Sequence, residues 1–173
     1  MRRVLSLLLL GCVACAAPVD LTVQAPATLA QEPVDGEIAR VTRIVDGDTI
    51  EVSLDGAISD VRLVGIDTPE SVRPNSPIEC FGREASAAAE AFLAGATVTL
   101  VRDVEDRDRY GRLLRYVYVG EEMANARLVV NGYATAYTYP PNVRHADLFV
   151  QLEREAREND RGLWSPDRCA GEP

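Results

Sequence analysis

The 173-residue chain contains no lysine and a single histidine, His145. Without lysine, the sequence excludes Schiff-base enzymes, P-loop NTPases and enzymes with a lysine nucleophile. One histidine excludes paired-histidine acid–base chemistry and histidine-rich zinc sites. Aromatic residues make up only 6% of the chain. The apolar run at residues 4–10 is too short for a transmembrane helix, which needs about 20 residues.

All 18 basic residues are arginines, and they face 27 acidic residues, so the formal net charge is −9. An acidic protein is a poor candidate for nucleic-acid binding, because phosphate contacts normally come from a basic surface. A nucleic-acid function must therefore be supported by a specific arrangement of residues. The length fits one globular domain with some additional sequence.

Residues 1–17 have the features of a signal peptide, with two arginines before a short apolar run. The segment Leu9-Leu10-Gly11-Cys12 resembles a bacterial lipobox that would make Cys12 the lipidated N-terminus, although Leu10 stands where a small residue is usual. Ordinary secretion with cleavage near Ala16-Ala17 is the alternative. We expect an exported protein, either a cell-envelope lipoprotein or a secreted periplasmic or extracellular protein.

Composition divides the rest of the chain into a linker, a domain and a tail. Residues 18–35 are rich in Pro, Ala, Thr, Gln and acids without a sustained period, which is typical of a flexible linker. Residues 36–169 form the expected domain, and residues 170–173 form a short tail.

Cys80 and Cys169 are the two cysteines outside the export segment. In an oxidising compartment such a pair favours a disulfide, and two buried thiols are the alternative. Closing a loop of about 90 residues would stabilise the fold by roughly 4 kcal/mol.

Short β-branched segments come first along the domain and helical segments follow. Strands are expected at residues 38–45, 49–54, 61–66, 97–101 and 112–119. Helices are expected at residues 84–93, 121–130 and 143–159. In the last helix, an apolar stripe is formed by Leu148, Leu152 and Ala156. This order predicts an α+β, mainly β fold: a five-stranded OB-type barrel with three helices packed on it.

A charged residue, Arg62, interrupts the apolar segment 61–66. In a regular strand Arg62 shares one face with Val64 and Ile66. A guanidinium on an apolar face must be paired or must point at a bound anion.

Acidic residues gather in two turns. Asp67 and Glu70 flank Thr68-Pro69, where they can face one small space; an Asx-type turn with solvated acids is the alternative. The segment Asp-Gly-Asp-Thr at 46–49 resembles the opening of an EF-hand loop but lacks its later ligands, so a hairpin turn is the simpler interpretation. Together with Asp67 it could supply hard oxygen ligands for Ca²⁺, and the missing Cys and His ligands argue against zinc.

Together these segments resemble the thermonuclease, or staphylococcal-nuclease-like, family. The resemblance covers about residues 36–168 and rests on four motifs: DGDT at 46–49, R-x-x-x-x-D-T-P-E at 62–70, Y-G-R at 110–112 and G-L-W-S at 162–165. It implies a five-stranded OB barrel with three helices and a Ca²⁺-dependent phosphodiesterase site.

The resemblance also implies roles for individual positions. The family's metal ligands match Asp48, Asp67 and, through its backbone carbonyl, Thr68, with Asp46 behind them. Its catalytic residues match Arg62, Glu70 and Arg112. The aromatic residues of its nucleotide pocket match Tyr110, Tyr137 and Tyr139.

This set suits phosphodiester hydrolysis, because the phosphate gains negative charge as water attacks. Ca²⁺ and two arginine forks would neutralise that charge. Glu70 would remove or orient the proton of the attacking water. No histidine is required, so we expect His145 to cap the last helix or to face solvent, and Trp164 to lie in the core.

The sequence therefore predicts an exported, monomeric, Ca²⁺-dependent nuclease that cleaves DNA and RNA with little sequence specificity and leaves 3′-phosphate ends. Membrane contact is expected only through lipidated Cys12. One alternative is a non-catalytic OB module that binds oligonucleotides, glycans or a protein partner at the cell envelope. Another is a structural envelope protein whose acidity keeps it soluble.

Overall fold

The computed structural model describes residues 34–71 and 79–169. The expected signal peptide with Cys12, nearly all of the linker and the tail at 170–173 lie outside the described residues. Within the described part of the chain, no helix is both long enough and apolar enough to cross a membrane.

Among the described residues, five strands form a closed barrel. They are β1 (Glu37–Ile44), β2 (Thr49–Leu54), β3 (Ala57–Leu63), β5 (Thr97–Val101) and β6 (Leu113–Val119). Strands pair antiparallel in the order β3-β2-β1-β5-β6, and the parallel pairing of β3 with β6 closes the cylinder. Successive side chains of a strand point to opposite faces, so every second residue points into the barrel. Ile50, Val52, Val61 and Leu63 are such residues, and they are fully buried.

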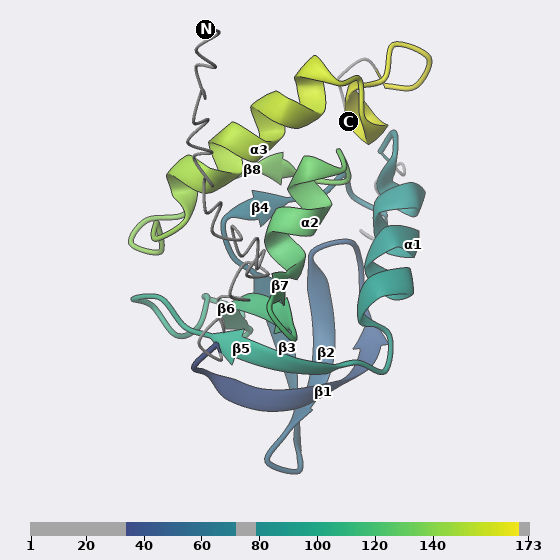
Figure 1. Cartoon of the computed structure of the whole chain (residues 1–173). Coiled ribbons are helices and arrows are strands. Elements are labelled where there is room, and N and C mark those ends of the chain that lie inside the picture. The colour runs from purple at the N-terminus through teal and green to yellow at the C-terminus, as the bar shows by residue number, and fades with distance from the viewer. Residues whose placement is uncertain (1–33, 72–78, 170–173) are drawn as a thin grey trace, which may run out of the picture. The chain divides into compact units, whose positions relative to one another are not determined.

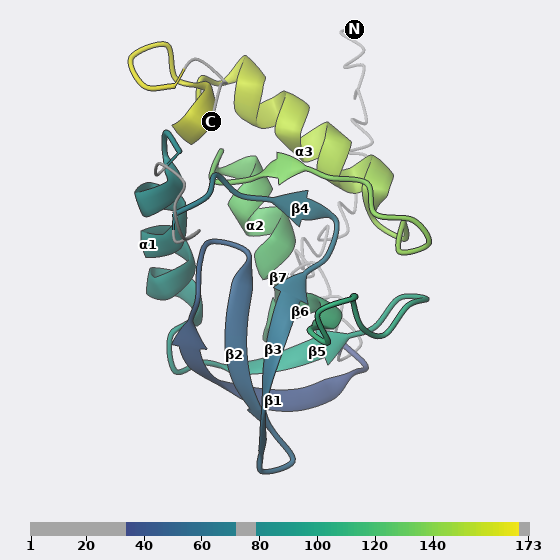
Figure 2. The ribbon, with the colours of Figure 1, turned by 180° about the vertical axis from the view of Figure 1, so that it is seen from behind.

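Three helices cover one end of the barrel (Figures 1 and 2). They are α1 (Gly82–Leu93), α2 (Ala124–Val130) and α3 (Ala146–Glu158), and a short 3-10 helix η1 (Gly162–Trp164) follows. Short strands complete the fold: β4 (Ile66–Asp67) pairs with β8 (Thr135–Ala136), and β7 (Glu122–Met123) pairs with β6. The predicted OB-type barrel with three helices is confirmed.

The third strand differs from its prediction. It begins earlier, at Ala57, and ends at Leu63, because Gly65 turns the chain with φ +84°. The regular alternation therefore stops before Val64, and the expected shared face of Arg62, Val64 and Ile66 is wrong. Val64 and Ile66 are buried in the core, whereas the Arg62 side chain is outside this core and pairs with Asp48 and Asp67.

Two helices begin later than predicted. α2 begins at Ala124 rather than Glu121, because the preceding residues pair with β6 as β7. α3 begins at Ala146, and the residue that it buries against the barrel is Phe149. Leu148 is 38% exposed, so its place in the predicted apolar stripe is wrong.

His145 immediately precedes α3, but its side chain makes no capping hydrogen bond. The imidazole packs edge-on against the ring of Tyr116, with 4.5 Å between ring centroids. The expected side-chain capping is therefore wrong, and His145 is only partly exposed to solvent. Partial burial, aided by the nearby charge of Arg144, lowers the pKa of His145.

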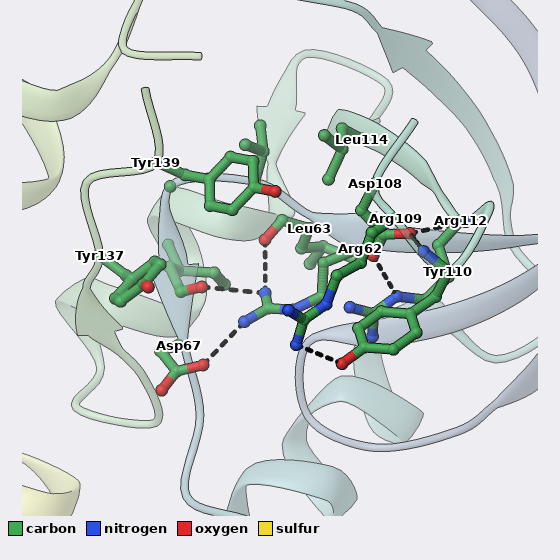
Figure 3. A pocket seen from close by; sticks show the side chains of 13 residues that line it. Arg62, Leu63, Asp67, Asp108, Arg109, Tyr110, Arg112, Leu114, Tyr137 and Tyr139 are labelled. Atoms are coloured by element: carbon green, nitrogen blue, oxygen red, sulfur yellow. Dashed lines mark hydrogen bonds and ion pairs between the residues drawn. The ribbon is translucent and has the colours of Figure 1, made fainter. Parts of the chain in front are cut away.

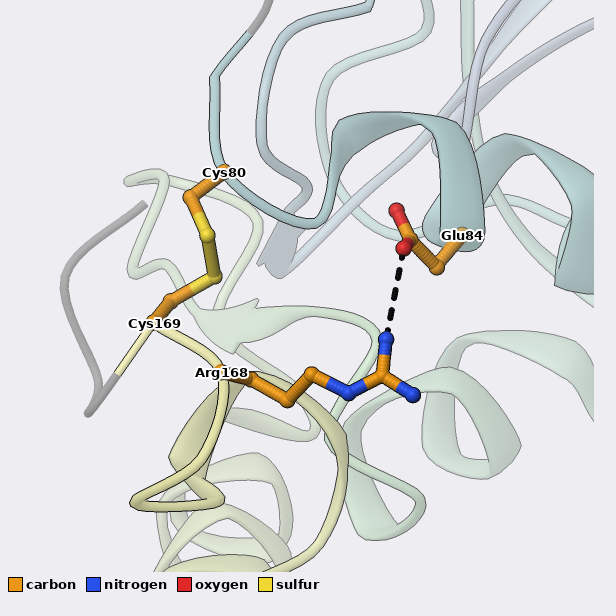
Figure 4. The surroundings of a disulfide bond; sticks show 4 residues. All are labelled: Cys80, Glu84, Arg168 and Cys169. Carbon is orange, nitrogen blue, oxygen red and sulfur yellow. Dashed lines mark hydrogen bonds and ion pairs between the residues drawn. A yellow bond between two sulfur atoms is a disulfide. The ribbon is translucent and has the colours of Figure 1, made fainter.

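The predicted disulfide between Cys80 and Cys169 is present, with a Cα–Cα distance of 5.9 Å (Figure 4). It joins the start of α1 to the C-terminal segment across 89 positions of sequence. Trp164 lies in a small buried cluster nearby, with Leu163 and Phe81, as expected for a core residue. The start of α1 is thus held from two sides, by the bridge and by packing.

Gly65 also fixes the position of α3. A Cβ atom built on Gly65 would overlap the ring of Phe149, so the glycine provides both the left-handed turn and the room for that ring. α3 therefore packs directly on the backbone that joins β3 to β4.

We predict that Gly65→Ala destabilises the protein more than Gly56→Ala. Both glycines have positive φ, +84° and +82°, but a Cβ on Gly56 would meet nothing within 4 Å. The backbone cost is about 1 to 2 kcal/mol at each position, and overpacking adds about 1 to 3 kcal/mol at Gly65 alone. Urea unfolding of both variants measures the difference, and equal losses would contradict the packing argument.

Candidate active site

The centre of the site is the guanidinium of Arg62, at the end of β3 (Figure 3). Its Nη1 donates to the backbone carbonyls of Leu63 and Ile66, at 2.8 and 2.9 Å. Its Nη2 lies 3.0 Å from Oδ2 of Asp48 and 2.7 Å from Oδ1 of Asp67. Because the side chain is only 16% exposed, its charge is held in one orientation by these oxygens.

Asp48 is placed by the turn between β1 and β2. The backbone N–H of Asp46 donates to the carbonyl of Thr49 at 3.1 Å, and the Asp46 carboxylate accepts the N–H of Asp48 at 3.0 Å. The buried Asp48 carboxylate in turn accepts hydrogen bonds from the N–H and hydroxyl of Thr68, at 2.9 and 3.2 Å. A side chain on Gly47 would collide with Thr68. The hairpin interpretation is confirmed, and the hairpin carries Asp48 into the site.

The carboxyl group of Asp46 has a raised pKa. Burial, together with repulsion from the neighbouring carboxylate of Asp48, raises the pKa of Asp46 to about 6. The turn therefore holds two carboxylates closer together than their charges favour.

The second predicted catalytic arginine, Arg112, is held by Asp108. Nε of Arg112 donates to Oδ2 of Asp108 at 2.7 Å, while Oδ1 accepts the backbone N–H groups of Tyr110 and Arg112, at 2.9 and 3.0 Å. Nη1 of Arg112 lies 3.5 Å from the hydroxyl of Thr49, which connects this loop to the turn that carries Asp48.

Asp108 was not predicted as a site residue, although its carboxylate determines where Arg112 points. Its side chain is only 6% exposed. Burial alone would raise the pKa of Asp108, but the hydrogen bonds from Arg112 and Tyr110 outweigh it, so the pKa is lowered. The available signal was an aspartate three residues before Gly111, a glycine with φ +86°, which is a typical Asx-turn arrangement.

A pocket of about 520 Å³ opens over these groups. Six of the predicted site residues line it: Arg62, Asp67, Tyr110, Arg112, Tyr137 and Tyr139. Figure 3 shows Tyr137 and Tyr139 across the Arg62 guanidinium from Tyr110. Tyr110 and Tyr137 are 69% and 50% exposed, and the guanidinium of Arg109 lies 4.7 Å from the Tyr110 ring centroid. Aromatic surface is therefore exposed at the pocket.

The two aromatic walls are tied together by Asn142, which sequence reasoning missed. Its Oδ1 accepts the backbone N–H groups of Val104 and Glu105, at 3.0 and 2.8 Å, and its own N–H donates to the carbonyl of Tyr139 at 2.8 Å. Asn142 is 1% exposed. The loop that carries Tyr110 and the loop that carries Tyr139 are therefore held in one arrangement.

Glu70 lies beside the pocket and is not among the residues that line it. Its backbone is clamped by Glu79: the N–H of Glu70 donates to Oε2 of Glu79 at 2.7 Å, and its carbonyl accepts the N–H of Glu79 at 2.9 Å. Gly82, the first residue of α1, packs so closely on the Glu70 carbonyl that a Cβ would not fit. The start of α1 thus determines where Glu70 lies.

The predicted metal ligands Asp48 and Asp67 lie close together. Oxygen atoms of Asp48 and Asp67 approach the same nitrogen, Arg62 Nη2, so one small space contains hard donors from both. The described residues contain no group of three or more His, Cys, Asp or Glu suited to a metal ion. Two carboxylates fit Ca²⁺, which also accepts carbonyl, water and substrate oxygens, and they do not fit zinc.

The closed five-stranded barrel with three helices places the protein in the class of OB-fold proteins. The family model described as "Staphylococcal nuclease homologue" matches residues 60–166. A thermonuclease from Staphylococcus intermedius is 43% identical over 131 residues, or 76% of this chain and 78% of that protein. A thermonuclease from Staphylococcus hyicus is 40% identical over 126 residues, or 73% and 75%.

A further relative is the endonuclease YncB of Bacillus subtilis (strain 168), which is 39% identical over 125 residues, or 71% of this chain and 59% of that protein. The chain belongs to the staphylococcal nuclease homologues, so the resemblance drawn from its motifs is confirmed.

We predict that Asp108→Asn lowers the free energy of unfolding at pH 7 by about 1 to 3 kcal/mol, since it removes a charged partner from Arg112. A lowered carboxyl pKa stabilises the fold above the unfolded pKa of about 3.9, and this contribution disappears as the pH falls through the folded value. The difference from wild type should therefore shrink below about pH 4. Urea unfolding across pH measures it, with the exposed Asp60→Asn as control; a pH-independent difference would contradict the assignment.

Proposed function

We propose that this chain is an exported, monomeric, Ca²⁺-dependent nuclease that cleaves DNA and RNA with little sequence specificity and leaves 3′-phosphate ends. Its family makes it a nuclease that hydrolyses phosphodiester bonds. The cofactor, the substrate range, the end chemistry and the location are the proposal. The observation that carries it is the meeting of Arg62, Arg112 and Asp67 in one pocket with three tyrosines.

Arg62 and Arg112 supply the positive charge that a phosphodiester requires. Guanidinium groups donate hydrogen bonds to non-bridging phosphate oxygens, which become more negative during attack by water. Arg112 has Nη2 available for this, and Nη2 of Arg62 would become available once Ca²⁺ takes over the carboxylates of Asp48 and Asp67. Both side chains are already oriented, Arg62 by two carbonyls and Arg112 by Asp108. Donors held in advance in this way stabilise a transition state without reorganising during the reaction.

Asp48, Asp67 and the carbonyl of Thr68 are the proposed holders of Ca²⁺. When bound, the ion supplies positive charge next to the phosphate and next to the carboxylates that now share Arg62. Thr68 restrains Asp48 through its N–H and hydroxyl, so the position of Asp48 would be the same with and without bound Ca²⁺.

Glu70 is the proposed general base, or the group that orients the attacking water. Its backbone, two residues beyond Thr68 in the chain, is fixed by Glu79 and by the start of α1, so the residue is held in one place for that role. The tyrosines offer faces on which any base can stack. Stacking supports weak sequence preference, because every base presents an aromatic face.

The experiment is a cleavage assay with single-stranded DNA and RNA, with Ca²⁺ or with EGTA. We expect cleavage of both substrates only with Ca²⁺, with 3′-phosphate product ends. Glu70→Gln should lower kcat by about 10²- to 10⁴-fold, the range of general-base catalysis, with little change in thermal stability. Glu121→Gln, at an exposed turn position, is the matched control. Full activity in EGTA rejects the cofactor, and Ca²⁺-dependent binding without cleavage indicates an OB binding module.

Export and lipidation are tested on the full-length chain in a bacterial host. If Cys12 is lipidated, the protein should fractionate with membranes and release the lipid-modified N-terminal peptide on proteolysis, and Cys12→Ser should abolish both. A mature N-terminus near Ala17 in the soluble fraction would instead indicate ordinary secretion.

A further inference from the structure

A second groove of about 520 Å³ lies between β1 and α1. Figures 1 and 2 show the end of β1 next to the helix. The part of the groove that matters here is formed by Arg43 and Val45 from the β1 side, by Ser71, and by Arg83, Ser86 and Glu90 from α1. None of its lining residues is aromatic.

The groove is continuous with the active site along the chain on both sides. Val45 directly precedes Asp46, and Ser71 directly follows Glu70. The aromatic pocket opens on the other side of the acids, over Arg62 and Arg112. A strand with one nucleotide in the aromatic pocket extends past the acids, and the residues next to those acids in the chain, Val45 and Ser71, line this groove.

The chemistry of the groove suits an anion. Arg83 is exposed and makes no hydrogen bond or ion pair within the described part of the chain, although most arginines of this acidic domain have an acid partner. Arg43 pairs with Glu51 at 3.1 Å but remains 56% exposed, so its other donors are free for a ligand. The hydroxyls of Ser71 and Ser86 lie 2.8 Å apart in the same groove; one donates to the other, which leaves one hydroxyl hydrogen for a ligand.

We propose that this groove binds the sugar-phosphate backbone of the nucleic-acid strand beyond the scissile phosphate, with Arg83 as its principal contact and Arg43 as a second. The proposal rests on the proposed function. Arginine forks and hydroxyls recognise phosphate, whereas base recognition would require aromatic or base-edge partners. The groove therefore adds affinity for long strands without adding sequence preference. The negative charge of Glu90, which also lines the groove, repels phosphate and lowers this affinity.

The test measures KM of wild type and variants for two substrates. One is a single-stranded DNA 12-mer, and the other is an unphosphorylated dinucleotide, which has no phosphate beyond the scissile one. Arg83→Gln should raise KM for the 12-mer by about three- to ten-fold, equivalent to one charged contact, and should change the dinucleotide much less. Glu90→Gln should act in the opposite direction and lower KM for the 12-mer. Arg154→Gln, an exposed arginine on α3 outside both pockets, is the matched control.

A second measurement uses binding of the 12-mer to the Glu70→Gln background at several salt concentrations with Ca²⁺. Each lost phosphate contact should reduce the slope of log K against log salt by about 0.7 for a single strand. We expect this reduction for Arg83→Gln and not for Arg154→Gln. Circular dichroism melting checks that the variants remain folded.

The outcomes separate the two proposals. If wild type cleaves both substrates but Arg83→Gln behaves like Arg154→Gln, the groove is rejected and the nuclease assignment stands. Equal losses on both substrates also reject the groove, because a local effect on the active site would then explain them. If wild type cleaves neither substrate, the proposed function fails and the groove proposal fails with it.

Discussion

The structure depends on one shared guanidinium, that of Arg62. A charge that is largely removed from water must find several partners, and Arg62 finds two backbone carbonyls and two carboxylates. These partners come from the β1–β2 turn, from the end of β3 and from β4. Three separate segments therefore have to meet at one point. The same contacts that satisfy the buried charge also bring two carboxylates and a guanidinium into one place.

The rest of the site follows from side chains that bind backbone groups of distant segments. Asn125 of α2 accepts the N–H of Val117 at 2.9 Å and donates to the carbonyl of Val64 at 2.9 Å, so α2 is joined to β6 and to the turn beyond β3. Asn142 joins the two loops of the aromatic pocket in the same way, and Asp108 fixes its own loop by accepting the N–H groups of Tyr110 and Arg112. Loops held in this way present catalytic groups without the freedom of ordinary surface loops.

The acidic balance, which argued against a nucleic-acid enzyme, has a different meaning in the folded chain. Many acids hold arginines in defined positions: Asp108 orients Arg112, and Glu37 and Asp106 enclose the buried Arg115. Net charge therefore describes the surface as a whole and not the potential inside a pocket. Arg83 has no such partner among the described residues, so its charge is not offset by an ion pair.

The amino-acid sequence alone indicated the barrel strands in their order along the chain, because period-two patterns and turn residues act over short distances. It also indicated the disulfide, from the two cysteines outside the export segment, and the acids and arginines of the site, from the family motifs. Tertiary structure decided where α2 and α3 begin, that Phe149 and not Leu148 faces the barrel, and that Asn142 joins the two loops of the aromatic pocket. These features depend on partners far along the chain: Asn142 binds the backbone of Val104, 38 positions away. No local pattern encodes such contacts, since they exist only once the barrel has brought the segments together.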